Sequence, residues 1–281
     1  MSKKLVVYII VLFLGLQPIH AGRQLICHQL ILGMIESINQ VKTVQYTLRA
    51  SEHVKGKILN ATSYIKIRFA PRQLYFKNNS GVEVIYNELA DREDALVNPN
   101  AFPYINLKLD PFRSIMRNNQ HHTIFELGFH HIGEILSNAV KQSDVNFDKW
   151  FTYLGIIKFN NRDCHKIYFE YPDFKYVKYT VRKKETVRSI AQKLGVGEYR
   201  IIQYNANISF TDYIKEGRVL VVPNVYASKT LMYIDKELNL PVYIKAFDDK
   251  GFYEAYEFYD LKVNMPFASN EFDKSFSGYD F

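Results

Sequence analysis

Long runs of alternating apolar and polar residues restrict the fold of this chain more than any other feature. Val44, Tyr46 and Leu48 alternate with polar residues, and after a turn at Gly56 the alternation returns at residues 64–69. The alternation returns at residues 151–171 and 230–263. Because successive side chains of a strand point to opposite faces, this period of two predicts an antiparallel sheet with one apolar face.

Two stretches space their apolar residues three or four apart instead, as amphipathic helices do. They cover Leu25–Val41 and Phe125–Val140, and we expect both helices to pack on the apolar face of the sheet. Residues 91–99 are polar, and we expect an irregular segment there. The predicted fold class is α+β.

A different pattern interrupts the sheet stretches at Lys178–Pro223. Residues 178–182 read as a strand, and Thr186 stands where a helix N-cap is expected, ahead of a short amphipathic helix. A second helix begins near Gly197, and a second strand ends at Pro223. The order strand, helix, helix, strand predicts a small module with a fold of its own.

This module resembles the LysM domain family. The positions that match the family pattern are Tyr179, Val181, Thr186, Ile190, Ala191, Asn205, Gly217, Leu220 and Pro223. The resemblance implies binding of N-acetylglucosamine-containing glycans, chiefly peptidoglycan or chitin, in a groove between two loops. The residues that it marks as glycan-binding are Lys183, Lys184, Glu185 and Thr186 in one loop and Ala206, Asn207, Ile208 and Ser209 in the other. The family usually has Gly at the position of Lys184, and the alternative is a module that serves as a spacer.

The sheet stretches on both sides of the module resemble a second family. An N-terminal helix, GVEVIYN at Gly81–Asn87 and NLPVYIKAFDDKGFYEAYEFYDLKVN at Asn239–Asn264 are similar to uncharacterised exported bacterial proteins of the LolA-like, lipoprotein-carrier-like type. That resemblance implies a curved antiparallel sheet, or half-open barrel, with helices across its mouth. Proteins of this type enclose acyl chains or lipoproteins, although a filled core is the simpler interpretation for a barrel of this size.

We therefore expect a signal peptide at residues 1–21, a LolA-like domain in two parts at residues 22–175 and 227–281, and an inserted LysM domain at residues 176–226. The terminal strands of a LysM module pair with each other, so the ends of the module lie close together. An insertion with adjacent ends can replace a hairpin turn without disturbing the sheet.

Residues 1–21 have the composition of a secretory signal peptide, with a basic start, an apolar run and a small residue at Ala21, near which we expect cleavage. The apolar run is short for a membrane span. We expect a periplasmic or secreted protein. In such an oxidising compartment Cys27 and Cys164 are a candidate disulfide, and two buried free thiols are the alternative.

The sequence offers little catalytic machinery. His130 and Glu134 share a predicted helix face, but a polar helix surface explains them better than a zinc site, and no nucleophile or nucleotide-binding motif is present. The formal charge of +7 is concentrated at residues 178–223, which contain nine basic and four acidic residues. This favours an anionic wall polymer or a solvated basic face.

The leading hypothesis is a non-enzymatic exported protein that binds peptidoglycan or another N-acetylglucosamine-containing glycan, while its LolA-like domain holds an apolar ligand or a partner protein. We expect no catalytic residue, metal or cofactor, and no nucleic acid partner. The alternative is a periplasmic lipid or lipoprotein carrier in which the LysM module is only structural. A wall hydrolase that uses the region of His130 and Glu134 is a third hypothesis, which metal analysis would test.

Overall fold

The computed structural model describes residues 17–281 and has the α+β fold expected from the sequence. The strands of one half of the main sheet are β1 (Thr43–Val54), β2 (Lys57–Arg68), β3 (Gln73–Asn78), β4 (Glu83–Asn87), β5 (Asp91–Asn98) and β6 (Leu107–Leu109). Those of the other half are β7 (Phe151–Phe159), β8 (Arg162–Glu170), β11 (Lys229–Asp235), β12 (Pro241–Asp248) and β13 (Gly251–Val263).

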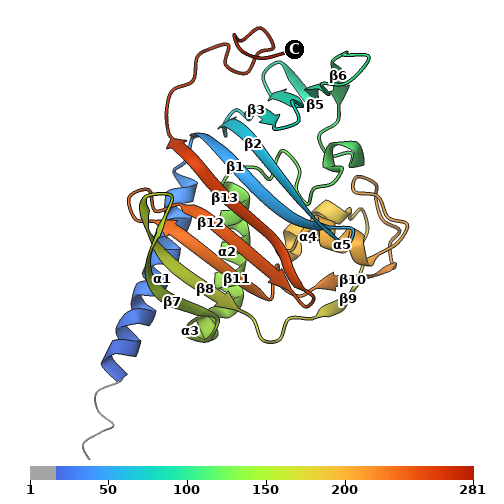
Figure 1. Cartoon of the computed structure of the whole chain (residues 1–281). Coiled ribbons are helices and arrows are strands. Elements are labelled where there is room, and N and C mark those ends of the chain that lie inside the picture. Colours follow the sequence, from blue (N-terminus) through green and yellow to red (C-terminus); the bar gives the residue numbers. More distant parts are fainter. Residues whose placement is uncertain (1–16) are drawn as a thin grey trace, which may run out of the picture.

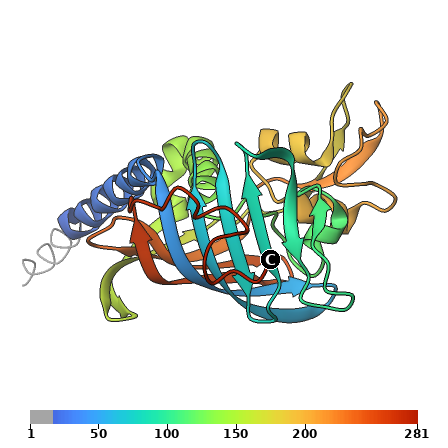
Figure 2. The ribbon, with the colours of Figure 1, turned by 90° about the horizontal axis from the view of Figure 1, so that it is seen from above.

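These strands form one antiparallel sheet of 11 strands in the order β6-β5-β4-β3-β2-β1-β13-β12-β11-β8-β7. The edge strands β6 and β7 do not pair with each other, so the sheet is open. It is also curved (Figures 1 and 2). The expectation of an irregular segment at residues 91–99 was wrong. Residues 91–98 form β5, in which Ala95 and Val97 are buried and Glu93 is exposed.

Helices cover the concave face of the sheet (Figure 2). They are α1 (Gln17–Asn39), α2 (His130–Ser143), α3 (Phe147–Trp150) and the 3₁₀ helices η1 (Ser114–Arg117) and η2 (Asp144–Asn146). Helix α1 buries Ile31, Met34 and Ile38 against the core, as its spacing predicts. Helix α2 begins later than expected, because Gly128 has a positive φ of 90° and its N–H donates to the Tyr46 hydroxyl at 3.0 Å.

The small module lies within the connection between two neighbouring strands of the main sheet, β8 and β11, in which Glu170 pairs with Lys229. It consists of β9 (Tyr176–Thr180), α4 (Val187–Leu194), α5 (Glu198–Tyr204) and β10 (Val219–Pro223). Strands β9 and β10 pair antiparallel in a second sheet, and the Asn224 N–H donates to the Lys175 carbonyl at 3.0 Å. The two ends of the module are therefore held side by side.

The start and end of α4 confirm the local prediction. The Thr186 hydroxyl accepts the Ser189 N–H at 3.1 Å, and the Ser189 hydroxyl accepts the Thr186 N–H at 2.9 Å, which completes a capping box. The helix ends at Gly195, which has a φ of 67°. The module also has a hydrophobic core of its own around Val187, Ile190 and Leu220.

Residues 264–281, which we expected only to belong to the last part of the LolA-like domain, pack on the convex face of the sheet. Tyr279 stacks on Tyr75 with ring centroids 3.7 Å apart, and Phe272 is buried beside them. Lys66 forms an ion pair with Glu271. Because Tyr75 points away from the concave side, this segment covers the opposite face from the helices.

The apolar run at residues 5–16 lies outside the described residues, and α1 passes through Ala21, so the signal peptide, its cleavage site and the domain boundaries stay predictions. Within residues 17–281 no helix is long and apolar enough to cross a membrane.

The candidate disulfide is not formed in the structure, where Cys27 on α1 and Cys164 on β8 are both buried free thiols. Burial raises the pKa of Cys27 to about 12 and that of Cys164 to about 11. Both thiols therefore act as small apolar side chains of the core.

Candidate functional site

The helices leave a cavity of about 720 Å³ on the concave side of the sheet. It lies between the strands, α2 and the loop that precedes α2, and its volume is within the range of roughly 300–1,000 Å³ found for ligand pockets. The apolar wall includes Leu48, Val84, Leu136, Met232 and Phe258. The interior is therefore not the filled core that the size of the sheet suggested.

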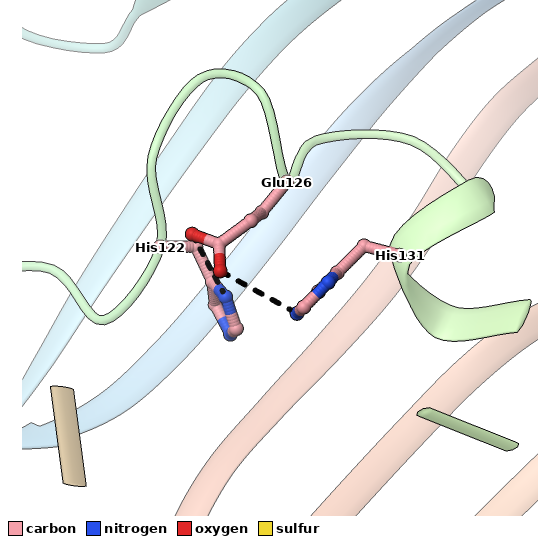
Figure 3. Close-up of side chains that lie close together, drawn as sticks. All are labelled: His122, Glu126 and His131. Carbon is pink, nitrogen blue, oxygen red and sulfur yellow. Dashed lines mark ion pairs between the residues drawn. The ribbon is translucent and has the colours of Figure 1, made fainter. Parts of the chain in front are cut away.

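One end of the cavity is polar. His122 and Glu126 lie on the loop between η1 and α2, and His131 lies in the first turn of α2 (Figure 3). Nδ1 of His122 is 3.7 Å from Oε2 of Glu126, and Nε2 of His131 is 3.6 Å from Oε1 of the same carboxylate. The sequence showed His122 and His131 as members of a histidine cluster with Glu134, but it did not point to Glu126.

Glu254 of β13 supports this cluster from the sheet. Its Oε2 is 3.4 Å from Nε2 of His122 and 2.8 Å from Nδ1 of His121, and its Oε1 accepts the Tyr226 hydroxyl at 2.6 Å. Glu52 lies beside it and accepts the His121 backbone N–H at 2.7 Å. Both carboxylates are buried.

The charges of these neighbours shift the pKa values in the cluster. Burial alone would lower the pKa of His122, but hydrogen bonds to Glu126 and Glu254 and their negative charge raise it well above its ordinary value. Burial alone would raise the pKa of Glu254, yet His121 and His122 hold it well below its usual range. The polar end of the cavity thus stabilises ionised carboxylates beside imidazoles.

The two loops that the LysM resemblance marks lie at the same end of the small sheet, because Thr180, the last residue of β9, pairs with Val219, the first of β10. Lys183 and Lys184 are exposed in the first loop, as are Ala206 and Asn207 in the second. Ser209 is also exposed, whereas Ile208, Glu185 and Thr186 are half-buried.

Several of these groups are already used within the module. The Glu185 carboxylate accepts the Tyr179 hydroxyl at 2.7 Å and the Arg182 N–H at 2.8 Å, and Thr186 caps α4. The Arg218 guanidinium donates to the carbonyls of residues 206 and 207 at 2.6 and 3.0 Å. The Ser209 hydroxyl accepts the Thr211 N–H at 3.2 Å. The polar side chains that remain available to a glycan are therefore mainly those of Lys183, Lys184 and Asn207.

Lys184 has a positive φ of 60°, in the left-handed region that glycine adopts most easily. This backbone conformation suits the Gly that the family usually has at this position, although the chain carries a lysine there. The long side chain is exposed.

Two buried ion pairs fix the module to the main sheet domain through α5. Nη2 of Arg117, from η1, is 2.7 Å from Oε2 of Glu198, and Nη1 of Arg200 is 2.6 Å from Oδ2 of Asp248 at the end of β12. The ring of Tyr199 stacks on His121 with centroids 4.5 Å apart. The face of the module that carries α5 is therefore covered by the host domain.

His130 and Glu134, the pair that the sequence singled out, line a separate hollow of about 380 Å³. The ring of His130 meets Phe69 edge-on at 4.0 Å, and burial lowers its pKa. Although it is adjacent in sequence to His131, it is not among the three clustered side chains. The closeness of His122, Glu126 and His131 in the sequence could have indicated a shared site. Whether their side chains contact one another depends on the path of the loop before α2.

The fold and its site define a sheet protein with a cavity that is apolar along its walls and polar at one end, and with a small βααβ module set between two neighbouring strands. The family of the LysM domain matches residues 179–223, which confirms that resemblance. The family described as "Protein of unknown function (DUF1571)" matches residues 41–195, more than half of the chain. The chain belongs to that family.

Several solved structures are similar to the chain. A putative outer membrane lipoprotein-sorting protein domain from Vibrio parahaemolyticus is 10% identical, with a TM-score of 0.33 over 89% of this chain and 97% of that one. The lipoprotein LppX of Mycobacterium tuberculosis is 11% identical, with a TM-score of 0.39 over 85% of this chain and 97% of that one. LprF of Mycobacterium bovis is 8% identical, with a TM-score of 0.41 over 86% of this chain and 94% of that one. A comparison with the curated proteins finds no match. The fold assignment rests on the sheet itself.

Proposed function

We propose that this chain is an exported, non-enzymatic protein that binds peptidoglycan or another N-acetylglucosamine-containing glycan through its LysM domain, while its sheet domain holds an apolar ligand. The observation that carries the proposal is the exposure of both predicted glycan loops at one end of the β9–β10 sheet, while the α5 face is buried against the host. A shallow groove that keeps its rim exposed after docking can still receive a polymer.

Co-sedimentation with purified insoluble peptidoglycan tests the glycan half of the proposal. We expect the full chain to pellet, and a Ser209→Trp variant to lose at least about tenfold in affinity, because an indole would fill the space between the loops. Lys149→Trp is the matched control, since Lys149 is exposed on α3, outside the module. Its binding should equal that of the unmodified chain.

The basic surface of the module requires a second condition in the same assay. Attraction between exposed charges is strongly screened at about 1 M salt, where the Debye length is about 3 Å. Binding that survives this salt and is displaced by soluble N-acetylglucosamine oligomers supports recognition of the glycan. Binding that disappears entirely in salt reduces the interaction to general charge attraction and contradicts the proposal.

The alternative function, a lipid or lipoprotein carrier whose LysM domain is structural, is favoured by one observation. Gly195 at the end of α4 lines the cavity together with Val225 and Tyr226, which follow β10. The module therefore also forms part of the cavity wall.

Displacement of a fluorescent fatty acid from the delipidated chain tests the cavity. Ala139→Trp on α2 would place an indole in the cavity and should weaken binding at least about tenfold. Lys141→Trp is the control, because Lys141 is exposed on the same helix. A fatty acid that binds both variants equally well does not occupy this cavity. Apolar binding without any glycan binding would place the carrier function first.

A further inference from the structure

The polar end of the cavity carries three groups that the proposed function leaves unused. His122, Glu126 and His131 converge from the loop before α2 and from its first turn, and their ligand atoms lie within 4.8 Å of one another (Figure 3). We propose that these three side chains bind a divalent transition metal ion. We take Zn²⁺ as the ion to test, because two imidazoles and one carboxylate hold zinc in several catalytic sites.

The distances suit a single ion between the three side chains. Zinc–ligand bonds of about 2.1 Å at tetrahedral angles place neighbouring donor atoms about 3.4 Å apart. The observed separations are 3.7 Å from Nδ1 of His122 to Oε2 of Glu126 and 3.6 Å from Nε2 of His131 to Oε1 of the same carboxylate. Both separations are close to this value, and because they involve different oxygens, the Glu126 carboxylate would bind the ion through both of them or rotate toward it.

The surrounding residues hold the proposed ligands as outer-shell partners do in metal sites. Oε2 of Glu126 accepts the Thr123 N–H at 2.6 Å and its hydroxyl at 3.1 Å, which leaves Oε1 toward His131. Nε2 of His122 lies 3.4 Å from the Glu254 carboxylate, so Nδ1 is the nitrogen left for a metal. A carboxylate behind a ligating histidine fixes its ring orientation and raises its basicity.

His131 provides an independent indication of a missing partner. Its Nε2 is buried and has no hydrogen-bond partner among the described residues. A buried polar atom of this kind requires an explanation, and an ion is one of the usual ones. A metal between His131 and Glu126 would satisfy this atom.

The charge around the site favours a cation over an anion. The carboxylates of Glu52, Glu126 and Glu254 all line this part of the cavity, as do the imidazoles of His122 and His131. Three protein ligands leave one position of a tetrahedral ion open. Because all three side chains line the cavity, that position would face its interior.

Calorimetric titration of the chelator-treated full chain with Zn²⁺, together with elemental analysis of bound metal, tests this proposal. We expect one Zn²⁺ per chain. His131→Ala and Glu126→Gln should each weaken binding by at least about 100-fold, because each removes a ligand. Glu254→Gln should weaken it by about 10- to 100-fold, as outer-shell changes do.

His130→Ala is the matched control, because it removes the adjacent imidazole of the same helix, which packs on Phe69 outside the cluster. Its affinity should stay within about twofold of the unmodified chain. Circular dichroism establishes which variants are folded, and the absorption spectrum of the Co²⁺-loaded chain reports imidazole and carboxylate coordination. Absence of stoichiometric Zn²⁺, or equal losses in the folded His130→Ala and His131→Ala variants, would overturn the proposal.

Discussion

Arg200 allows the attachment of the LysM domain to the sheet domain to be tested by one substitution. Its side chain is 1% exposed, its Nη1 contacts Asp248 at 2.6 Å and the Tyr176 hydroxyl at 2.9 Å, and its guanidinium lies 3.6 Å from the ring centroid of Tyr253. Arg200→Ala removes the cation and leaves the buried Asp248 carboxylate without it. Breaking a buried pair in this way costs about 3–5 kcal/mol.

This loss is large compared with the free energy of unfolding of a domain, which is about 5–15 kcal/mol. Lys229→Ala is the control, because it breaks an ion pair with Glu170 in which the two side chains are 48% and 44% exposed. An exposed pair of this kind contributes about 0–1 kcal/mol. The double substitution Arg200→Met with Asp248→Asn should recover most of the loss, because no unpaired charge then remains buried.

Urea denaturation provides the assay with two probes. The single tryptophan of the chain, Trp150, lies on α3 and packs on Phe169 and Tyr171, so its fluorescence reports on the sheet domain. Circular dichroism reports on the whole chain. We expect coincident curves for the unmodified chain and separate ones for Arg200→Ala. A loss below about 1 kcal/mol, equal to that of Lys229→Ala, would refute this account of the interface.

Two further predictions concern single sites. Lys184→Gly should stabilise the module by up to about 1 kcal/mol in thermal denaturation, because the left-handed backbone is strained for lysine. The control Lys183→Gly should destabilise the module by about 0.5–1 kcal/mol. The opposite order of stability would contradict the backbone conformation assigned to Lys184. The raised pKa values of Cys27 and Cys164 predict negligible reaction with a thiol reagent at pH 8 in the folded chain and two reactive thiols after denaturation. Finding none after denaturation would show that the two cysteines are bonded.

Local features of the sequence predicted the elements whose ends are set by neighbouring residues. Helix α4 begins after Thr186 and ends at Gly195 as expected, because capping depends on a few adjacent backbone groups. The four polar residues at 160–163 predict a hairpin turn in the same local way, and the structure shortens it to Asn160 and Asn161, both with a positive φ. Strand β5 was missed because alternation between Ala95 and Val97 is weak in a polar segment near the sheet edge.

The candidate metal site depends on contacts between distant residues, and periodicity does not report them. The Arg72 guanidinium, which follows β2, donates to the carbonyls of Ile124, Phe125 and Leu127 at 3.1, 3.2 and 3.3 Å. These bonds set the path of the loop that brings Glu126 toward His131. The sequence showed the histidines, but the choice between His130 and His131 required the direction in which α2 presents each ring.

The position of the LysM domain between β8 and β11 determines how a mechanical load would enter the protein. A pull on a glycan-bound module would reach Glu170 and Lys229, which pair at the same end of two antiparallel strands. Because the two ends of the module are held side by side, the pull would act on β8 and β11 together and along their length, and would load their ladders with β7 and β12 at the same time. The buried pairs Arg117–Glu198 and Arg200–Asp248 bypass these ladders and would carry the load first. Their strength would then set the force at which a tethered sheet domain begins to open.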